Sequence, residues 1–173
     1  MMMAKVWQIY DDIGYTACTT GNYDLAERMF TAAIESCASL TSMQEQKLKS
    51  LIGLADTLLL RGQRADGCRL YSRVINIFAR TGASTHHQRY MLAHALEKLG
   101  YSRIEEQRHD DALKLLQRSL RILENIYGGV HQSLVPRLLK ISLVHSQLRN
   151  TDESLAYLNR ARSIQSALQN TAS

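Results

Sequence analysis

The side chains best suited to chemistry are scattered along this chain. Of the six histidines, His86 and His87 are adjacent at the expected start of a helix, and His94 and His145 fall on two different expected helices. No histidine pair combines the i, i+4 spacing of a helical metal site with a nearby carboxylate or thiol. The sequence therefore predicts neither a bound metal nor another cofactor.

The serines, threonines and carboxylates lack the local setting of a catalytic group. No Ser, Cys or Thr lies in a strained turn such as Gly-x-Ser-x-Gly, and no glycine-rich phosphate loop is present. The carboxylate pairs are adjacent in sequence: Asp11–Asp12, Glu105–Glu106 and Asp110–Asp111. Adjacent residues on a helix point about 100° apart, which is poor geometry for a general acid and base. We therefore expect no enzymatic activity.

The three cysteines, Cys18, Cys37 and Cys68, are odd in number and form no Cys-x-x-Cys pair. Free cysteine behaves as a small apolar residue, so we expect three buried free thiols in a reducing cytoplasm. Residues 1–12 contain no apolar run of signal-peptide length, and no segment approaches the ~18 apolar residues of a membrane span. The sequence favours a cytoplasmic protein that does not cross a membrane.

The net charge of +5 is unevenly distributed. Residues 1–50 hold four basic and six acidic side chains, whereas the remaining residues hold seventeen basic and ten acidic ones. Two interpretations are open. The excess can be a solvated helix surface laced with salt bridges, or it can attract nucleic acid or an acidic protein.

Helices must position any site in this chain, because apolar residues recur at steps of three and four. Within the stretch 21–34, a glycine turn precedes Tyr23, and Ala26 and Phe30 mark one helical stripe. The arrangement returns three more times, with equivalent turn residues 41, 45 and 42 residues apart: Gly21, Gly62, Gln107 and Arg149. A recurring period of this size predicts a helical repeat array.

The pattern predicts an all-α chain that forms a single domain over residues 1–173. The expected helices cover residues 4–20, 23–39, 43–60, 65–80, 86–106, 110–127, 133–148 and 152–168. They give four helix–turn–helix repeats at about 4–40, 43–82, 86–127 and 131–168, followed by a frayed tail at 169–173. No strand-like alternation competes with this pattern.

Three columns of residues keep their character in all four repeats. The first column is small: Gly14, Ala55, Gly100 and Ser142. The second is also small: Ala26, Gly67, Ala112 and Ser154. The third is large and apolar: Phe30, Tyr71, Leu116 and Leu158. On these residues the chain resembles the tetratricopeptide repeat (TPR) family, which implies a right-handed α-solenoid in which small residues let paired helices nest.

The period is longer than the 34 residues usual for that family. It resembles the long-repeat subclass seen in kinesin light chains. The segment 126–131, with Tyr127, Gly128 and His131, resembles the linker between repeats in that subclass, although Gln132 stands where a proline is typical. The characteristic asparagine pair is replaced by Leu139 and Lys140.

The resemblance implies a concave groove lined by the first helix of each repeat. In the first repeat the facing positions are Gln8, Asp11, Tyr15 and Thr19, and in the second Lys49, Ile52, Asp56 and Leu59. The third repeat gives His94, Glu97, Tyr101 and Ile104, and the fourth gives Leu139, Leu143, Ser146 and Gln147. The aliphatic members can equally pack against the neighbouring helix.

Tyr15 and Tyr101 are the expected anchors of this groove, because a ring with a polar tip suits a half-wet contact surface. Some members of the family grip a peptide carboxylate with cations. Here Asp11, Asp56 and Glu97 occupy the face instead. This arrangement argues against such a clamp and favours a segment with apolar anchors and basic flanks.

The leading hypothesis is therefore a non-enzymatic adaptor or scaffold that binds a protein or peptide segment in the groove. One alternative is a regulatory or nucleic-acid-associated factor that uses basic residues of the second helices: Arg69, Arg73, Lys114, Arg118 and Arg121. Another is a chaperone for a secreted substrate. Apolar residues at both ends of the array also predict self-association: Trp7, Ile9, Tyr10, Ile13, Leu155, Tyr157, Leu158 and Ile164.

Overall fold

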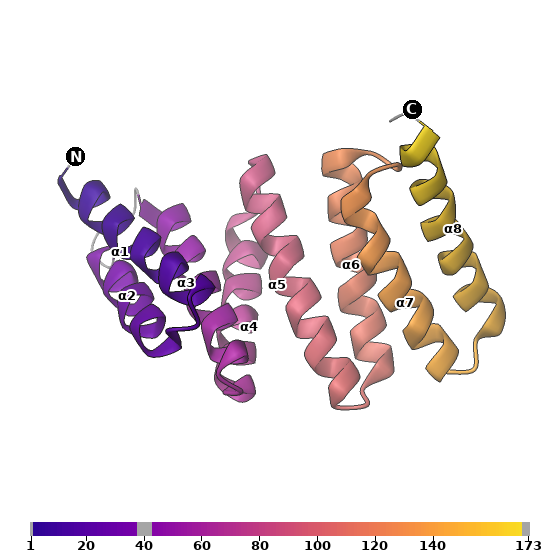
Figure 1. Cartoon of the computed structure of the whole chain (residues 1–173), viewed down its shortest axis with the longest axis horizontal. Helices are drawn as coiled ribbons and strands as arrows, with labels where there is room; N and C mark the ends of the chain where they lie inside the picture. Colours follow the sequence, from indigo (N-terminus) through magenta and orange to yellow (C-terminus); the bar gives the residue numbers. More distant parts are fainter. Residues whose placement is uncertain (1, 38–42, 171–173) are drawn as a thin grey trace. The chain divides into compact units, whose positions relative to one another are not determined.

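The structure is a computed structural model that describes residues 2–37 and 43–170. Within these ranges all regular structure is helical, which confirms the all-α class. The elements are α1 (Met2–Thr19), α2 (Tyr23–Ser36), α3 (Gln44–Leu60), α4 (Arg64–Thr81), α5 (His86–Glu105), α6 (His109–Tyr127), the short 3-10 helix η2 (Gln132–Leu134), α7 (Val135–Gln147) and α8 (Thr151–Asn170). Consecutive helices form antiparallel pairs (Figure 1).

The helix ends differ slightly from the sequence-based expectation. Helix α2 ends at Ser36 and is capped by Cys37, so it is shorter than expected. The expected connector at 38–42 lies outside the described residues. Helix α8 continues to Asn170, so residues 169 and 170 of the expected frayed tail are helical, and residues 171–173 lie outside the described part.

The four turns within the pairs share one residue in the left-handed region. Gly21 and Gly62 have φ values of 75° and 79°. The equivalent residues Gln107 and Arg149 have φ values of 60° and 61° although they carry a Cβ. Left-handed backbone costs a non-glycine residue roughly 1–2 kcal/mol, so the same turn is retained in the last two pairs despite strain.

The chain divides into two compact units, Met1–Gly82 and Ala83–Ser173, and each contains two helix pairs. The first unit has a buried cluster formed by Ala17, Ala26 and Phe30. The second has a larger cluster that includes Leu116, Leu123, Leu138 and Ile141. The single domain expected from the sequence stays a prediction.

The small-residue columns lie where paired helices approach each other most closely. A Cβ on Gly14 would come within 2.9 Å of the Phe30 ring, and one on Gly67 within 3.0 Å of the Ala55 carbonyl oxygen. In the fourth repeat both small positions are serines. The Ser142 hydroxyl donates to the Ser154 carbonyl oxygen at 2.8 Å, and the Ser154 hydroxyl donates to the Ser142 carbonyl oxygen at 2.9 Å.

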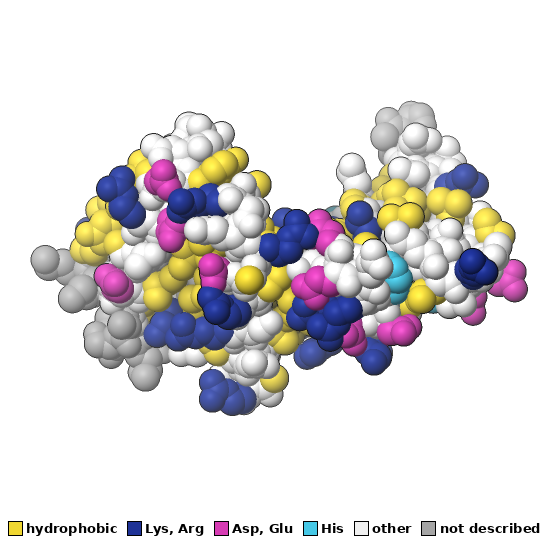
Figure 2. Space-filling model, turned by 90° about the horizontal axis from the view of Figure 1, so that it is seen from below, with side chains coloured by type: hydrophobic (Ala, Val, Ile, Leu, Met, Phe, Trp, Pro, Cys, Tyr) yellow, Lys and Arg dark blue, Asp and Glu magenta, His cyan; other side chains and the backbone are white. Residues whose placement is uncertain are grey.

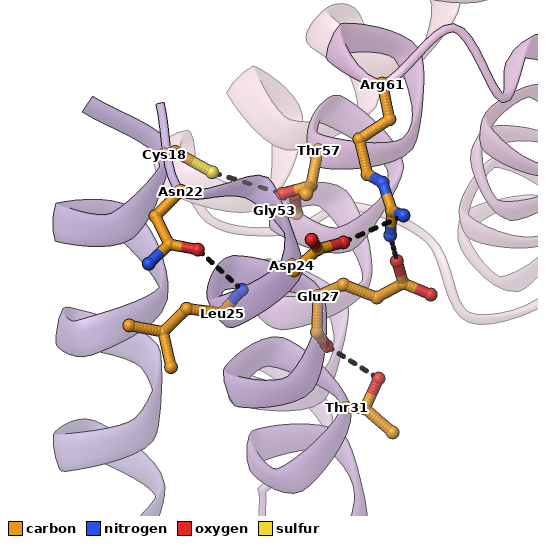
Figure 3. A network of polar contacts seen from close by, with 9 residues as sticks. All are labelled: Cys18, Asn22, Asp24, Leu25, Glu27, Thr31, Gly53, Thr57 and Arg61. Atoms are coloured by element: carbon orange, nitrogen blue, oxygen red, sulfur yellow. Dashed lines mark hydrogen bonds and ion pairs between the residues drawn. The ribbon is translucent and has the colours of Figure 1, made fainter. Parts of the chain in front are cut away.

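A polar contact links the two pairs of the first unit (Figure 3). Arg61, which caps the end of α3, reaches back to the first turns of α2, where it forms ion pairs with Asp24 and Glu27. The Cys18 sulfur lies 3.1 Å from the Thr57 hydroxyl, which also donates to the Gly53 carbonyl oxygen. Helix α3 therefore has polar contacts with both helices of the first pair, with α1 through Cys18 and with α2 through Asp24 and Glu27.

The cysteines are free, and their burial differs from the expectation. Cys37 is buried, and burial raises the pKa of its thiol. Cys18 and Cys68 are only partly buried, so the expectation of three buried thiols is wrong for these two. None of the helices in the described ranges is both long and apolar enough to span a bilayer.

Candidate interaction face

Asp11 lies on α1 and is completely buried. Its carboxylate forms an ion pair with Lys49 on α3, at 2.7 Å from Nζ to Oδ2. It also accepts a hydrogen bond from the Ser50 hydroxyl at 2.8 Å, and that hydroxyl accepts one from Trp7 Nε1 at 2.8 Å. The buried charge is therefore satisfied by the first helix of the following repeat.

Lys49 also contacts two aromatic rings of α1. Its Nζ lies 5.4 Å from the Trp7 ring centroid and 5.2 Å from that of Tyr15, within the range of cation–π attraction. The Tyr15 ring meets Phe30 edge-on at 5.0 Å. Partial burial and the nearby Asp11 carboxylate raise the pKa of the Tyr15 hydroxyl, so this ring presents a neutral polar tip.

The second unit repeats this arrangement with different residues. Glu97 on α5 is 6% exposed and forms an ion pair with Arg137 on α7 at 2.5 Å. The Tyr101 hydroxyl donates a hydrogen bond to the Glu97 carboxylate at 2.5 Å. Lys140 on α7 lies over the Tyr101 ring at 5.2 Å from its centroid. Burial and the bond to Glu97 raise the pKa of Tyr101.

Each unit therefore contains one set of contacts that we call a clasp. The first clasp consists of Asp11, Tyr15 and Lys49, and the second of Glu97, Tyr101, Arg137 and Lys140. In both, an acid and a tyrosine one turn further lie on the first helix of one repeat. The cations come from the first helix of the next repeat and join the two repeats.

This geometry corrects the expectation that the groove carboxylates are open to a partner. Asp11 and Glu97 are buried and ion-paired inside the clasps, because the following helix supplies a cation to each. Asp56 accepts a hydrogen bond at 2.5 Å from the hydroxyl of Tyr71, whose ring is fully buried. The acidic character expected for this face is therefore largely neutralised within the protein.

The remaining predicted groove residues differ in exposure. Gln8 is exposed, and His94 is half-buried with its ring stacked on Tyr90. Ile52 is 7% exposed, so the packing alternative applies to this residue. Leu139 and Leu143 on α7 are 41% and 46% exposed. These two leucines are one helical turn apart, which gives the second unit an open apolar stripe.

We call the surface formed by Tyr101, Leu139, Lys140 and Leu143 the α7 face. Lys140 lies beside both leucines on the helix and covers the Tyr101 ring. Among the residues that the structure describes, Lys140 forms no ion pair with a carboxylate. The α7 face is therefore apolar with a positive charge in its middle.

The basic residues proposed for the alternative function lie on the opposite helices. Lys114, Arg118 and Arg121 form an exposed stripe on α6, and none of them pairs with a carboxylate in the described ranges. Arg69 on α4 is paired with Asp66. Figure 2 shows a face on which basic and acidic side chains lie next to one another, with apolar side chains exposed between them.

The sequence analysis placed Lys49 on the groove face formed by the first helices of the repeats, but it did not identify Arg137 and Lys140 as part of that face. The sequence does contain a signal for these cations. Each buried acid lies on the first helix of one repeat, and the first helix of the next repeat carries a cation that faces it. Recognising that pattern requires knowing which helices are neighbours. The repeat period provides that knowledge only after the helix pairs have been assigned.

The comparisons with known proteins agree with the geometry of the helix pairs. Residues 90–167 match the family profile of the tetratricopeptide repeat. This part of the chain is similar to tetratricopeptide repeats. The matched segment lies within the second unit and covers most of α5 and α8, all of α6 and α7, and the whole second clasp. No curated protein matches the chain in sequence.

Several solved structures share the fold over most of the chain. The apo form of RapI is 14% identical with a TM-score of 0.83, covering 96% of this chain and 58% of that one. BtubC (BKLC) from P. vanneervenii is 18% identical with a TM-score of 0.80, covering 94% and 64%. The TPR-like repeats of a putative kinesin light chain from Podosopora anserina are 17% identical with a TM-score of 0.78, covering 96% and 77%.

These similarities show the fold expected from the sequence. The chain spans less than two thirds of the length of RapI and of BtubC. Tetratricopeptide repeat arrays are in general interaction scaffolds, and the matched segment 90–167 contains the α7 face.

Proposed function

We propose that the protein is an adaptor that binds a segment of another protein on the first helices of its repeats, with the α7 face as the main contact. The exposed pair Leu139 and Leu143 carries this proposal. Two large apolar side chains one turn apart form an exposed stripe that can anchor the apolar face of a partner segment, and Lys140 next to Leu139 lies over the half-buried Tyr101 ring.

The charge of the α7 face indicates the kind of segment it accepts. Glu97 is already paired with Arg137, whereas Lys140 has its ammonium group over the Tyr101 ring and free of any described carboxylate. A partner with apolar anchors and acidic flanks complements this face. The basic flanks expected from the sequence rested on open carboxylates, and burial of Asp11 and Glu97 removes that argument.

A peptide library displayed on phage tests the proposal. Selection against the whole chain should enrich segments that combine apolar anchors with aspartate or glutamate. Their affinity should fall about tenfold or more in Leu139→Ser/Leu143→Ser, because losing hot-spot contacts costs of order 2 kcal/mol. Lys140→Glu should mainly slow association and reduce the salt dependence.

The matched control is Leu155→Ser, which removes a leucine of similar exposure from α8. It should leave peptide affinity unchanged. Equal binding to Leu139→Ser/Leu143→Ser and to the parent chain would refute the assignment of the α7 face. Failure to enrich any segment would refute peptide binding as such.

The unpaired stripe on α6 supports a second candidate, a factor that binds an acidic partner or nucleic acid through Lys114, Arg118 and Arg121. Its weakness is that base stacking needs an exposed ring, whereas Tyr71 on α4, like the equivalent Leu116 on α6, is fully buried. Retention on heparin that depends steeply on salt and is lost in Arg118→Glu/Arg121→Glu would favour this candidate over the α7 face.

A further inference from the structure

The outward face of α1 carries apolar side chains that the proposed function does not use. Ile9 is 58% exposed and Ile13 is 39% exposed, one helical turn apart. On the adjoining side of the same helix, Gly14 and Ala17 are buried in the first unit. The apolar surface of α1 therefore extends from the buried side of the helix onto a side that faces solvent.

The apolar residues on this side, of which Val6 is half-buried, follow the spacing of a helix–helix seam. Val6, Ile9 and Ile13 are separated by three and then four residues, and Thr16 and Thr20 continue the same line. Alternating steps of three and four keep a seam on one side of a helix facing a partner helix. The apolar part of the seam is short and has Ile9 at its centre.

Two opposite charges lie on either side of Ile9. Lys5 and Asp12 are both exposed, and they are seven residues apart, so they share one side of the helix. Neither forms an ion pair with another side chain in the described part of the chain. In two antiparallel helices that meet between positions 8 and 9, position 5 of each faces position 12 of the other.

We propose that α1 forms a symmetric antiparallel dimer interface with a second copy of the chain. The twofold axis passes beside Ile9, so that Ile9 packs against its own counterpart and Val6 and Ile13 close the seam on either side. Lys5 of each copy pairs with Asp12 of the other, which makes the surface self-complementary as a twofold contact requires. A parallel arrangement would leave the charges of the two copies on opposite sides of the seam, where they cannot pair.

The outward face of α8 does not offer an equivalent surface. In the second unit, α6 buries Leu120 and Leu123, and the equivalent positions in α8 are Arg162 and Gln165, both exposed. Of the apolar residues expected at this end, Leu155 is exposed and Ile164 is buried. Self-association was expected at both ends, and of the two end helices α1 is the one with an apolar outward face.

Sedimentation equilibrium over a range of protein concentrations tests the proposal. The whole chain should dimerise reversibly, and Ile9→Lys should raise the dissociation constant about tenfold or more because it places two lysines at the twofold axis. Lys5→Asp alone and Asp12→Lys alone should each weaken the dimer by about tenfold, since each sets two pairs of like charges opposite one another. The double swap Lys5→Asp/Asp12→Lys should restore the parent value.

All of these side chains are exposed, so the helical circular dichroism and melting temperature of each variant should match the parent. Leu155→Lys, which adds a charge at an exposed leucine of α8, should not affect dimerisation. A chain that stays monomeric at millimolar concentration would overturn the proposal. So would a dimer insensitive to Ile9→Lys, and a double swap that fails to recover what both single changes lose would overturn the antiparallel register.

Discussion

Glu97 and Arg137 form a buried ion pair that the position of Glu97 in the sequence does not reveal. From the sequence, Glu97 is a surface carboxylate on a helix face. In the structure the side chains of Glu97 and Arg137 are 8% and 13% exposed and form a close ion pair. Breaking a buried pair leaves a charge without compensation and costs more than the pair itself contributes. The second clasp is therefore a structural contact that also sets the charge of the α7 face.

Arg137→Met should destabilise the second unit by about 3–5 kcal/mol, because Glu97 stays buried without its cation. Glu97→Gln/Arg137→Met should cost clearly less, since both charges are then removed. Urea denaturation followed by circular dichroism measures these differences. The control is Arg103→Met, which removes a more exposed ion pair with Glu106 and should cost at most about 1 kcal/mol. Equal stability of all variants would show that the clasp contributes nothing.

The candidate site was only partly predictable at this scale. Tyr15, Tyr101, Leu139 and Leu143 could be placed on the first helices because helical periodicity fixes which residues share a face. Whether each charged side chain is paired could not be predicted, because its partner lies about forty positions away on another helix. Asp11 is neutralised by Lys49, and no local pattern around Asp11 contains that information.

At the scale of the helices, the close approach of neighbouring helices decides how large the side chains between them can be. Phe30 on α2 lies between α1 and α3. Its ring is within 2.9 Å of where a Cβ on Gly14 would be, and within 2.5 Å of where one on Gly53 would be. The small columns recognised in the sequence included Gly14 but not Gly53, since Gly53 concerns packing between repeats rather than within one. Contacts within a repeat recur with the period, whereas this one does not.

Gly53→Ala should destabilise the first unit by about 1–3 kcal/mol through overpacking against Phe30, even though alanine favours a helix. The cost should shrink in a Phe30→Leu background, because the smaller side chain leaves room for the added methyl group. Thermal and urea unfolding of the four chains of this double-mutant cycle give the coupling. Gly129→Ala, which meets open space, is the control and should be neutral. Additive effects in the cycle would rule out the proposed clash.

The helices themselves were predictable because every level of the sequence agrees on them. Periodicity, turn residues and small columns all indicate the same eight segments, and the observed bounds differ by a few residues at most places. The exceptions have local causes. Helix α2 stops at Ser36, where Cys37 takes the capping position, and Gln107 and Arg149 keep a left-handed turn that glycine forms elsewhere.

At the scale of the whole molecule, the division into two units is the property that the period alone does not reveal. Each unit has two helix pairs, its own buried cluster and its own clasp. The second unit also contains the segment with the tetratricopeptide repeat match. These features indicate that the second unit holds most of the interactions needed for its own stability.

A fragment of residues 83–173 should therefore fold without the first unit. It should show helical circular dichroism and a cooperative thermal transition, and Leu138→Ala, which removes a fully buried side chain, should lower its stability by about 2–5 kcal/mol. Measurement of the fragment beside the whole chain tests this directly. An unfolded fragment would show that the second unit depends on residues of the first.

The two clasps also bear on how such a chain can change in length. Asp11 and Glu97 are 86 residues apart, as are Tyr15 and Tyr101, whereas Ile52 and Asp56 occupy the same positions in the repeat between them. The true period of the sequence is thus two repeats, one supplying the acid and the next the cation. Loss of the second repeat alone would set the acid-bearing helices of the first and third repeats side by side, so we expect such an array to change in length by matched pairs of repeats.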